Sequence, residues 1–83
     1  MDIKEILAKN VKKYRLQLGY SQEDLAGICS SIREDDGLSN RSFISDIENC
    51  RRNIALDKIE LLALALEIEP YQLFLTKNQG ELV

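Results

Sequence analysis

The sequence predicts an all-α protein folded as a compact bundle of five helices. Apolar side chains recur at helical spacing along most of the chain, and the 83 residues include a single proline. No run of strictly alternating apolar and polar residues precedes a hairpin turn, so strands are not predicted. Short connections leave no room for a second layer of structure. We therefore expect one domain over residues 1–77, followed by a flexible tail over residues 78–83.

Start and stop signals delimit the first two helices. Gly19 follows the first apolar stripe and suits a helix end. Ser21 and Asp24 form a capping-box pattern, which places the start of the second helix at Gln22. Apolar residues at helical spacing then extend this helix to about Ile32. The stripe predicted for the first helix comprises Ile3, Ile6, Leu7, Val11, Tyr14, Leu16 and Leu18.

A third helix follows a predicted turn at Asp36–Gly37. Ser39 or Asn40 is in position to cap its first turn, because a short polar side chain there accepts from the free amides. Apolar residues then recur at helical spacing on one side of the segment. The inward face of this helix is predicted to consist of Phe43, Ile44 and Ile47.

The C-terminal part predicts two more helices. The fourth spans about Leu56 to Leu66, although Ala55 at its cap position offers no side-chain acceptor. Pro70 is tolerated in a first helical turn and opens a short fifth helix over residues 70–77. The inward residues of the fourth helix are predicted to be Leu56, Ile59, Leu62, Ala63 and Leu66.

Composition narrows the functional classes. With two cysteines and no histidine, neither a zinc site nor a nucleophile paired with an imidazole is expected. There is no glycine-rich phosphate loop, so we expect no enzyme, no cofactor or metal, and no small-molecule ligand. The longest apolar run, Leu61 to Leu66, is too short to span a membrane, and no signal peptide is expected. These features favour a cytoplasmic protein with Cys29 and Cys50 reduced.

Charge is unevenly distributed along the chain. The net charge is −3, from 11 basic and 14 acidic residues. Residues 1–52 carry nine of each sign, whereas residues 53–83 carry two basic and five acidic side chains. The whole negative excess therefore lies in the C-terminal third, and the remainder of the chain is free to present a local basic patch.

Three segments in order resemble a known family. They are "LQLGYSQEDLA", "GLSNRSFISDIENCRRN" and "LDKIELLALALEIEPYQLF". Together they resemble the helix-turn-helix domain of lambda repressor and Cro-type (Xre-like) regulators, which include phage repressors and restriction–modification controller proteins. The resemblance runs from Ile6 to Phe74. The sequence departs from the family pattern in a longer segment between the second and third helices, which predicts a lengthened connection, and in Cys50 and Ile54, where glycine and proline are frequent.

The resemblance implies a homodimer that binds a (pseudo)palindromic operator in double-stranded DNA. In this family the second helix crosses the phosphate backbone and the third enters the major groove. Carried onto this chain, the residues implied to contact bases are Arg41, Ser42 and Ser45. The residues implied to contact phosphates are Gln22, Asn40, Asn49, Arg51, Arg52 and Asn53. Asp46 would be repelled by DNA, and we expect its side chain to point sideways.

The resemblance also implies two structural roles. Arg15 and Glu48 occupy positions that form a partly buried ion pair between the first and third helices. The short fifth helix carries more apolar side chains than it can bury, which predicts a dimer interface. The residues predicted for this interface are Ile68, Tyr71, Leu73, Phe74 and Leu75.

Two functions remain open from the sequence. The favoured one is a sequence-specific transcriptional regulator, working in the cytoplasm in association with the nucleoid. The alternative is a protein-interaction module, adaptor or antitoxin-like, with weak or no DNA binding; the acidic balance, the long connection and Asp46 favour it. DNA binding is favoured by basic side chains at Arg41, Arg51, Arg52, Lys9, Lys12 and Lys13. The pattern does not distinguish activator from repressor, nor a phage from a restriction–modification context.

Overall fold

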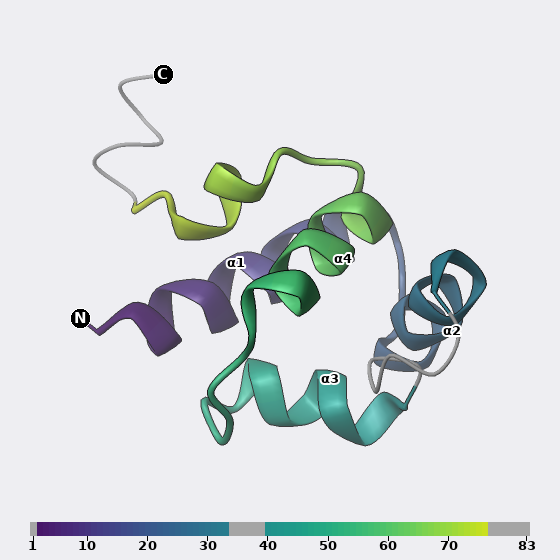
Figure 1. Ribbon diagram of the computed structural model, residues 1–83, viewed down its shortest axis with the longest axis horizontal. Helices are drawn as coiled ribbons and strands as arrows, with labels where there is room; N and C mark the ends of the chain where they lie inside the picture. Colours follow the sequence, from purple (N-terminus) through teal and green to yellow (C-terminus); the bar gives the residue numbers. More distant parts are fainter. Residues whose placement is uncertain (1, 34–39, 77–83) are drawn as a thin grey trace.

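The computed structural model describes residues 2–33 and 40–76. Its elements are α1 (Ile3–Gln17), α2 (Gln22–Ile32), α3 (Arg41–Glu48), α4 (Leu56–Leu66) and the 3₁₀ helix η1 (Pro70–Phe74). No strand occurs in these two ranges (Figure 1). The all-α prediction is confirmed. The short fifth helix predicted to begin at Pro70 is a 3₁₀ segment of five residues rather than a further α-helix, the form that helical pieces of a few residues commonly take.

Three predictions fall partly or wholly outside the described residues. These are the turn at Asp36–Gly37, the tail over residues 78–83, and most of the connection between the second and third helices. The described parts fix only its two ends, because α2 extends to Ile32 and α3 begins at Arg41. The predicted extent of the second helix is therefore confirmed.

The longest helix, α1, organises the bundle. It packs against α3, α4 and η1, while α2 packs against α3 and α4. As a result α3 lies at one edge of the molecule and η1 at the opposite edge, with α1 and α4 between them (Figure 1). Among the described elements, this arrangement leaves one side of α3 without a covering helix. The fully buried side chains at the centre are Val11, Leu25, Cys29, Ile44, Leu61, Leu62, Leu66 and Leu73.

Helical periodicity predicted which side of each helix is buried better than how far along the helix the burial extends. Ile44, Ile47, Leu62, Ala63 and Leu66 are buried as expected. The prediction is wrong for Leu56, which is 84% exposed because it is the first residue of α4 and lies beyond the end of the core. Three members of the apolar stripe predicted for the first helix are also exposed, namely Ile3, Leu16 and Leu18.

Side chains cap the starts of α1, α2 and α3; at α1 the Asp2 carboxylate accepts from the Glu5 amide at 3.1 Å. The predicted capping box at α2 is present: the Ser21 hydroxyl accepts from the Asp24 amide, and the Asp24 carboxylate accepts from the Ser21 amide, both at 2.9 Å. For α3 the cap is Asn40, whose Oδ1 accepts from the Ser42 amide at 2.7 Å. No side chain caps α4 at Ala55, in keeping with the sequence. The start of α4 therefore depends on packing alone.

The same backbone motif ends α1, α3 and α4. In each helix a residue in the left-handed region follows the last turn: Gly19 at φ 75°, Cys50 at φ 60° and Glu67 at φ 60°. Two successive amides then donate back to carbonyls of the last turn at 2.9–3.2 Å, the pattern of a Schellman motif. Only glycine adopts this conformation without strain, so Cys50 and Glu67 each carry a steric cost. This geometry gives a physical reason why glycine suits position 50.

Glu67→Gly is expected to raise the free energy of unfolding by about 1 kcal/mol, because glycine removes the left-handed strain at an exposed position. Removing a negative charge from the end of α4 also favours the helix dipole. Urea denaturation followed by circular dichroism measures the change. Glu67→Gln is the matched control, since it removes the charge but keeps the strain. A glycine variant no more stable than the glutamine variant would contradict this account.

A buried amide fastens η1 to α1. Asn10 is 8% exposed, and its Nδ2 donates to the carbonyl of Leu73 at 2.7 Å and to that of Leu75 at 2.9 Å. Both carbonyls lie near the C-terminal end of η1, where a helix leaves its acceptors unpaired. One side chain of α1 therefore satisfies the end of η1 and fixes its position on the bundle.

Three further observations concern the classes of site considered from composition. No helix within residues 2–33 and 40–76 is long and apolar enough to cross a membrane. In that same part of the chain, no group of three or more potential ligands is placed to hold a metal ion. Cys29 is buried and Cys50 is half-buried, and both thiols are free. Burial raises the pKa of Cys29 to about 11, which keeps this thiol protonated and unreactive.

Candidate nucleic-acid interface

One face of α3 belongs to the core and the opposite face is open to solvent. Ile44 and Ile47 are 0% and 3% exposed, and α3 packs against α1 and α2. Arg41 and Ser42 are exposed, while Ser45 is half-buried. Their spacing of i, i+1 and i+4 places these three side chains on the same side of the helix, called the outer face of α3 below. Among the described residues, Arg41 has no hydrogen-bond or ion-pair partner.

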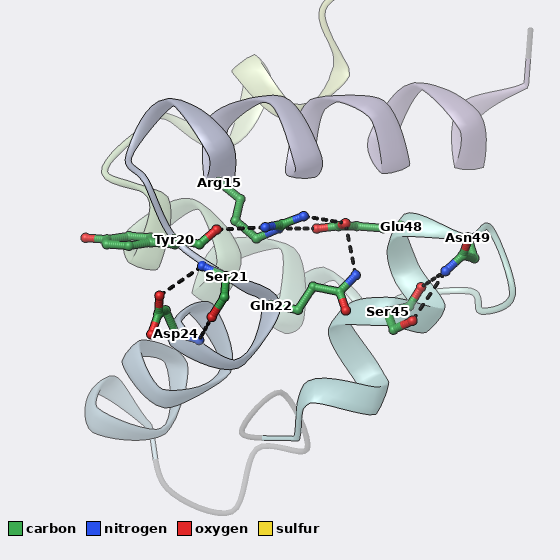
Figure 2. Close-up of polar contacts among 8 residues, drawn as sticks. All are labelled: Arg15, Tyr20, Ser21, Gln22, Asp24, Ser45, Glu48 and Asn49. Carbon is green, nitrogen blue, oxygen red and sulfur yellow. Dashed lines mark hydrogen bonds and ion pairs between the residues drawn. The ribbon is translucent and has the colours of Figure 1, made fainter.

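Two asparagines flank the outer face of α3. Asn40 uses its side-chain oxygen to cap the helix, so its amide nitrogen remains available for another partner. Asn49 donates from Nδ2 to the carbonyl of Ser45 at 2.8 Å and to its Oγ at 3.3 Å (Figure 2). The Ser45 hydroxyl is therefore held by a neighbour and can still donate its own proton. The outer face continues through Asn49 at the end of the helix.

A buried ion pair joins α3 to α1. Arg15 donates from Nε to Glu48 Oε2 at 2.7 Å and from Nη2 to Oε1 at 3.0 Å, while Nη1 donates to the Tyr20 carbonyl at 2.7 Å (Figure 2). The two side chains are 8% and 4% exposed. The fork of the guanidinium therefore matches both carboxylate oxygens, which fixes the rotation of α3 about its axis relative to α1.

The same carboxylate also holds α2. Gln22, the first residue of α2, donates from Nε2 to Glu48 Oε1 at 3.2 Å (Figure 2). Side chains from α1, α2 and α3 thus meet at one carboxylate, called the Glu48 hub below. The amide of Gln22 keeps a second N–H and its oxygen for other partners. Because Gln22 is half-buried and stands at a helix N-terminus, its free N–H lies in a region that favours anions.

Three exposed polar residues follow the end of α3, namely Arg51, Arg52 and Asn53, and they are called the basic loop. The left-handed turn at Cys50 folds this loop back beside α3. Asp46 of α3 accepts from Arg52 Nε at 2.9 Å, and its other oxygen lies 3.6 Å from Arg51 Nη1. Asp46 therefore points toward the basic loop, which gives a concrete form to the sideways orientation expected from the sequence.

Electrostatics and stacking hold the basic loop in place. The hydrogen bond from Arg52, with the charges of both arginines, holds the pKa of Asp46 below its usual range. Asp46 is therefore ionised at neutral pH. The guanidinium of Arg52 also lies over the ring of Phe43, 4.6 Å from its centre. Arg52 is thus positioned by two side chains of α3, one anionic and one aromatic.

The residues predicted for a dimer interface divide into buried and accessible ones. Leu73 is 0% exposed and belongs to the core of the chain, so the prediction that it lies in an interface is wrong. Its carbonyl is one of the two held by Asn10, which seats η1 with Leu73 inward. Tyr71 is 60% exposed. The half-buried members of the predicted set are Ile68, Phe74 and Leu75.

An apolar pocket lies beside the exposed start of α4. Its volume is about 260 Å³, and it opens between the N-terminal part of α1, the segment before α4, and η1. Leu56, 84% exposed, and Ile3, 64% exposed, contribute to its wall. The remaining lining residues are Lys4, Leu7, Ile47, Arg52, Asn53, Ile54, Ile59 and Phe74. A large exposed apolar side chain beside an apolar pocket is a feature of protein contact surfaces.

Sequence reasoning missed several residues of this region. The role of Asn10 had no local signal, because its partners lie more than 60 positions away. The stacking of Arg52 on Phe43 and the pairing of Arg52 with Asp46 depend on how the chain turns at Cys50. A glycine-preferring position directly after an amphipathic helix is the signal that could have predicted this reversal.

Comparisons with known proteins identify relatives of this chain. No family model matches the chain. A hypothetical transcription factor from Neisseria meningitidis serogroup B is 42% identical over 78 residues, covering 94% of this chain and 66% of that relative. The control protein C.SmaI from Serratia marcescens is 46% identical over 66 residues, covering 80% of this chain and 69% of the relative. The chain belongs to the controller-protein family of helix-turn-helix regulators.

Solved structures support membership of the controller-protein family across the whole fold. The controller protein C.AhdI from Aeromonas hydrophila matches with a TM-score of 0.72 and 35% identity, covering 86% of this chain and 96% of that one. A hypothetical transcription factor from Neisseria matches with a TM-score of 0.84 and 38% identity, covering 99% of this chain and 86% of that chain.

Proposed function

We propose that this controller-family protein is a sequence-specific DNA-binding transcriptional regulator that inserts α3 into the major groove. The observation that carries the proposal is the outer face of α3, which presents Arg41, Ser42 and Ser45 to solvent while the opposite face builds the core. A helix exposed along one side and fixed to its neighbours along the other is what groove insertion requires. Such a protein would act in the cytoplasm, at the nucleoid.

Base recognition is assigned to the outer face of α3. Arg41, at the first position of the helix, has the fork geometry to donate two hydrogen bonds to guanine O6 and N7. Ser42 and Ser45 offer hydroxyls that act as donors or acceptors at base edges or phosphates. Ser45 is additionally oriented by Asn49, so its hydroxyl enters the groove in a restricted set of directions.

Phosphate contacts are assigned to the start of α2 and to the two ends of α3. Gln22 would use its second N–H, supported by the dipole at the start of α2. Asn40, Asn49 and the basic loop would contact phosphates at the two ends of α3. These contacts set the register of the protein on the duplex and carry most of the salt dependence, whereas base contacts carry the specificity.

We further propose a homodimer that binds two half-sites. A single helix in one groove buries too little surface for tight specific binding, and a two-fold axis doubles the contact. The exposed Leu56 and its neighbouring apolar pocket supply a projection and a recess on the same surface, as an isologous interface needs. Phe74 lines this pocket, which connects it to the η1 surface predicted from the sequence.

Arg41→Ala is expected to lower the preference for the specific site over random duplex by about tenfold to a hundredfold, the value of one bidentate base contact. The specific duplex is selected by the wild type from a random-sequence pool, and affinities are measured by fluorescence anisotropy at low and physiological salt. Arg33→Ala is the matched control, because Arg33 contacts α4 through Asp57 and Glu60 rather than lying on α3.

The control variant should keep both affinity and preference. Failure of the wild type to bind any duplex at low salt would overturn the proposal and favour the protein-interaction module. Binding with no sequence preference would overturn the specific role of α3 while leaving a phosphate-binding surface.

A further inference from the structure

Asp46 is the acidic side chain nearest to the arginines of the basic loop. It lies on α3, its side chain is 23% exposed, and each of its oxygens is directed at a different arginine. The side chains of Arg51 and Arg52 are 65% and 50% exposed, so both are accessible to solvent, although Arg52 also contacts the Phe43 ring. The pairing therefore lies on the surface assigned to DNA, not in the core.

The Asp46 carboxylate contacts the same two guanidinium groups that the proposed function assigns to DNA phosphates. Carboxylates and phosphates bind guanidinium groups through the same charged oxygens and the same planar geometry. Arg52 uses its Nε for Asp46 at 2.9 Å, and this donor is then not available to a phosphate. To contact DNA through that donor, Arg52 must exchange one anion for another. The favourable free energy of the contact between Arg52 and phosphate is therefore reduced by the loss of its contact with Asp46.

Asp46 contributes a large share of the net charge of the segment over residues 41–53. Residues 41–53 contain three arginines and two acids. One of the acids, Glu48, is already balanced by Arg15 of α1. Asp46 is therefore the one acid in this segment whose charge is set against the proposed DNA-contacting arginines. Its removal would raise the effective local charge from +2 to +3.

Arg52 does not depend on Asp46 alone for its position. Its guanidinium also lies over the Phe43 ring at 4.6 Å. Without the carboxylate this stacking still holds the side chain on α3. The loss of Asp46 would then free hydrogen-bond donors of Arg52 while Phe43 still holds the side chain in place. A change in DNA affinity could therefore be attributed to competition by Asp46 and not to a less ordered Arg52.

We propose that Asp46 competes with DNA phosphate for the arginines of the basic loop. This competition sets the affinity of the basic loop for DNA and limits non-specific binding. The inference rests on the proposed function, because it concerns the same interface. Non-specific affinity comes almost wholly from phosphate contacts, so a competitor at the basic loop lowers it directly. From the sequence, Asp46 is expected only to be repelled by DNA. Its contacts with Arg51 and Arg52 give it a further role, because they lower the affinity of these arginines for phosphate.

The test compares Asp46→Asn with the wild type on a random-sequence duplex and on the selected duplex, by anisotropy over a salt series. One additional phosphate contact steepens the slope of log K against log salt by about 0.9. At 0.1 M salt this corresponds to about fivefold to tenfold tighter binding of the random duplex. Asp57→Asn is the matched control, since it removes the same charge from an exposed residue of α4.

A double-mutant cycle shows whether the effect passes through the basic loop. In an Arg51→Gln, Arg52→Gln background, Asp46→Asn should change the affinity by less than about twofold. Circular dichroism and thermal unfolding establish that each variant is folded. If Asp46→Asn is unfolded, Asp46→Ser and the Arg51→Gln, Arg52→Gln variant take its place, and the serine variant must show the same tightening.

Each outcome is decisive. Tighter binding of random duplex with a steeper salt slope, lost in the arginine-free background, supports the inference. Equal or weaker binding by a folded Asp46→Asn, while the wild type still selects a sequence, overturns the inference and leaves the proposed function intact. Equal tightening by Asp57→Asn would show a general charge effect and would also overturn it. A wild type that binds no duplex overturns both proposals.

Discussion

Glu48→Ala is expected to lower the free energy of unfolding by about 3–5 kcal/mol, the usual cost of removing one partner from a buried ion pair. The Glu48 side chain is 4% exposed and accepts hydrogen bonds from Arg15 Nε and Nη2 and from the amide of Gln22. The variant would leave the Arg15 charge buried with one remaining partner, the Tyr20 carbonyl. Domains of this size are stable by roughly 5–15 kcal/mol, so this loss is a large share. Urea denaturation followed by circular dichroism measures it.

Two controls separate burial from the mere presence of an ion pair. Glu60→Ala breaks the pair with Arg33 at the surface, where the side chains are 62% and 36% exposed, and should cost less than about 1 kcal/mol. The double variant Arg15→Met, Glu48→Met removes both charges and should recover most of the loss. A Glu48→Ala variant no less stable than Glu60→Ala would show that the hub does not hold the three helices together.

Leu73→Ala is expected to destabilise the folded chain by about 3 kcal/mol, since Leu73 is fully buried and truncation leaves a cavity. The location of Leu73 in the core predicts that this loss is independent of protein concentration. An interface residue would behave differently, because dimer stability depends on protomer concentration. Thermal unfolding at two protein concentrations a hundredfold apart distinguishes these cases.

Tyr71→Ala is the matched control within η1. Tyr71 is 60% exposed, so its loss should change the stability of the protomer by less than about 1 kcal/mol. If the η1 surface contributes to the proposed dimer, the same change weakens dimerisation in sedimentation equilibrium. A Leu73→Ala variant with normal protomer stability and weakened dimerisation would contradict the placement of Leu73 in the core.

The sequence predicted the elements well where the signal is local. The start of α2 follows from Ser21 and Asp24, whose side chains and amides bond each other across a single turn. The end of α2 at Ile32 follows from apolar spacing, and the end of α1 follows from Gly19. Each of these signals depends on neighbours within about four residues, so no knowledge of the tertiary fold was needed.

The errors concern how far the core extends along each helix. Periodicity identifies the side of a helix that faces inward but not the length over which other elements cover it. Leu56 lies on the predicted inward stripe of α4 and is nevertheless 84% exposed, because no element within residues 2–33 and 40–76 covers the first turn of α4 on that side. The number of apolar side chains on the short fifth helix predicts that Leu73 lies in an interface. The amide of Asn10, distant in sequence, instead seats η1 so that Leu73 is buried within the chain.

The residues of the candidate site could be predicted from the sequence, but the contacts between their side chains could not. Helical spacing is enough to place Arg41, Ser42 and Ser45 on one side of α3. The contact of Gln22 with Glu48 depends on the packing of α2 against α3, and the contact of Arg52 with Asp46 depends on the reversal at Cys50. Such contacts are set by tertiary geometry and leave no periodic trace in the sequence.

The Glu48 hub has a consequence for the kinetics of the proposed DNA complex. Because one buried carboxylate links α1, α2 and α3, the relative orientation of α2 and α3 is settled when the chain folds. The two helices then meet the duplex as one rigid body, with no ordering of one against the other left to occur in the encounter. The association rate is then governed by diffusion and electrostatic steering, and differences between operators appear mainly in how long the protein stays bound.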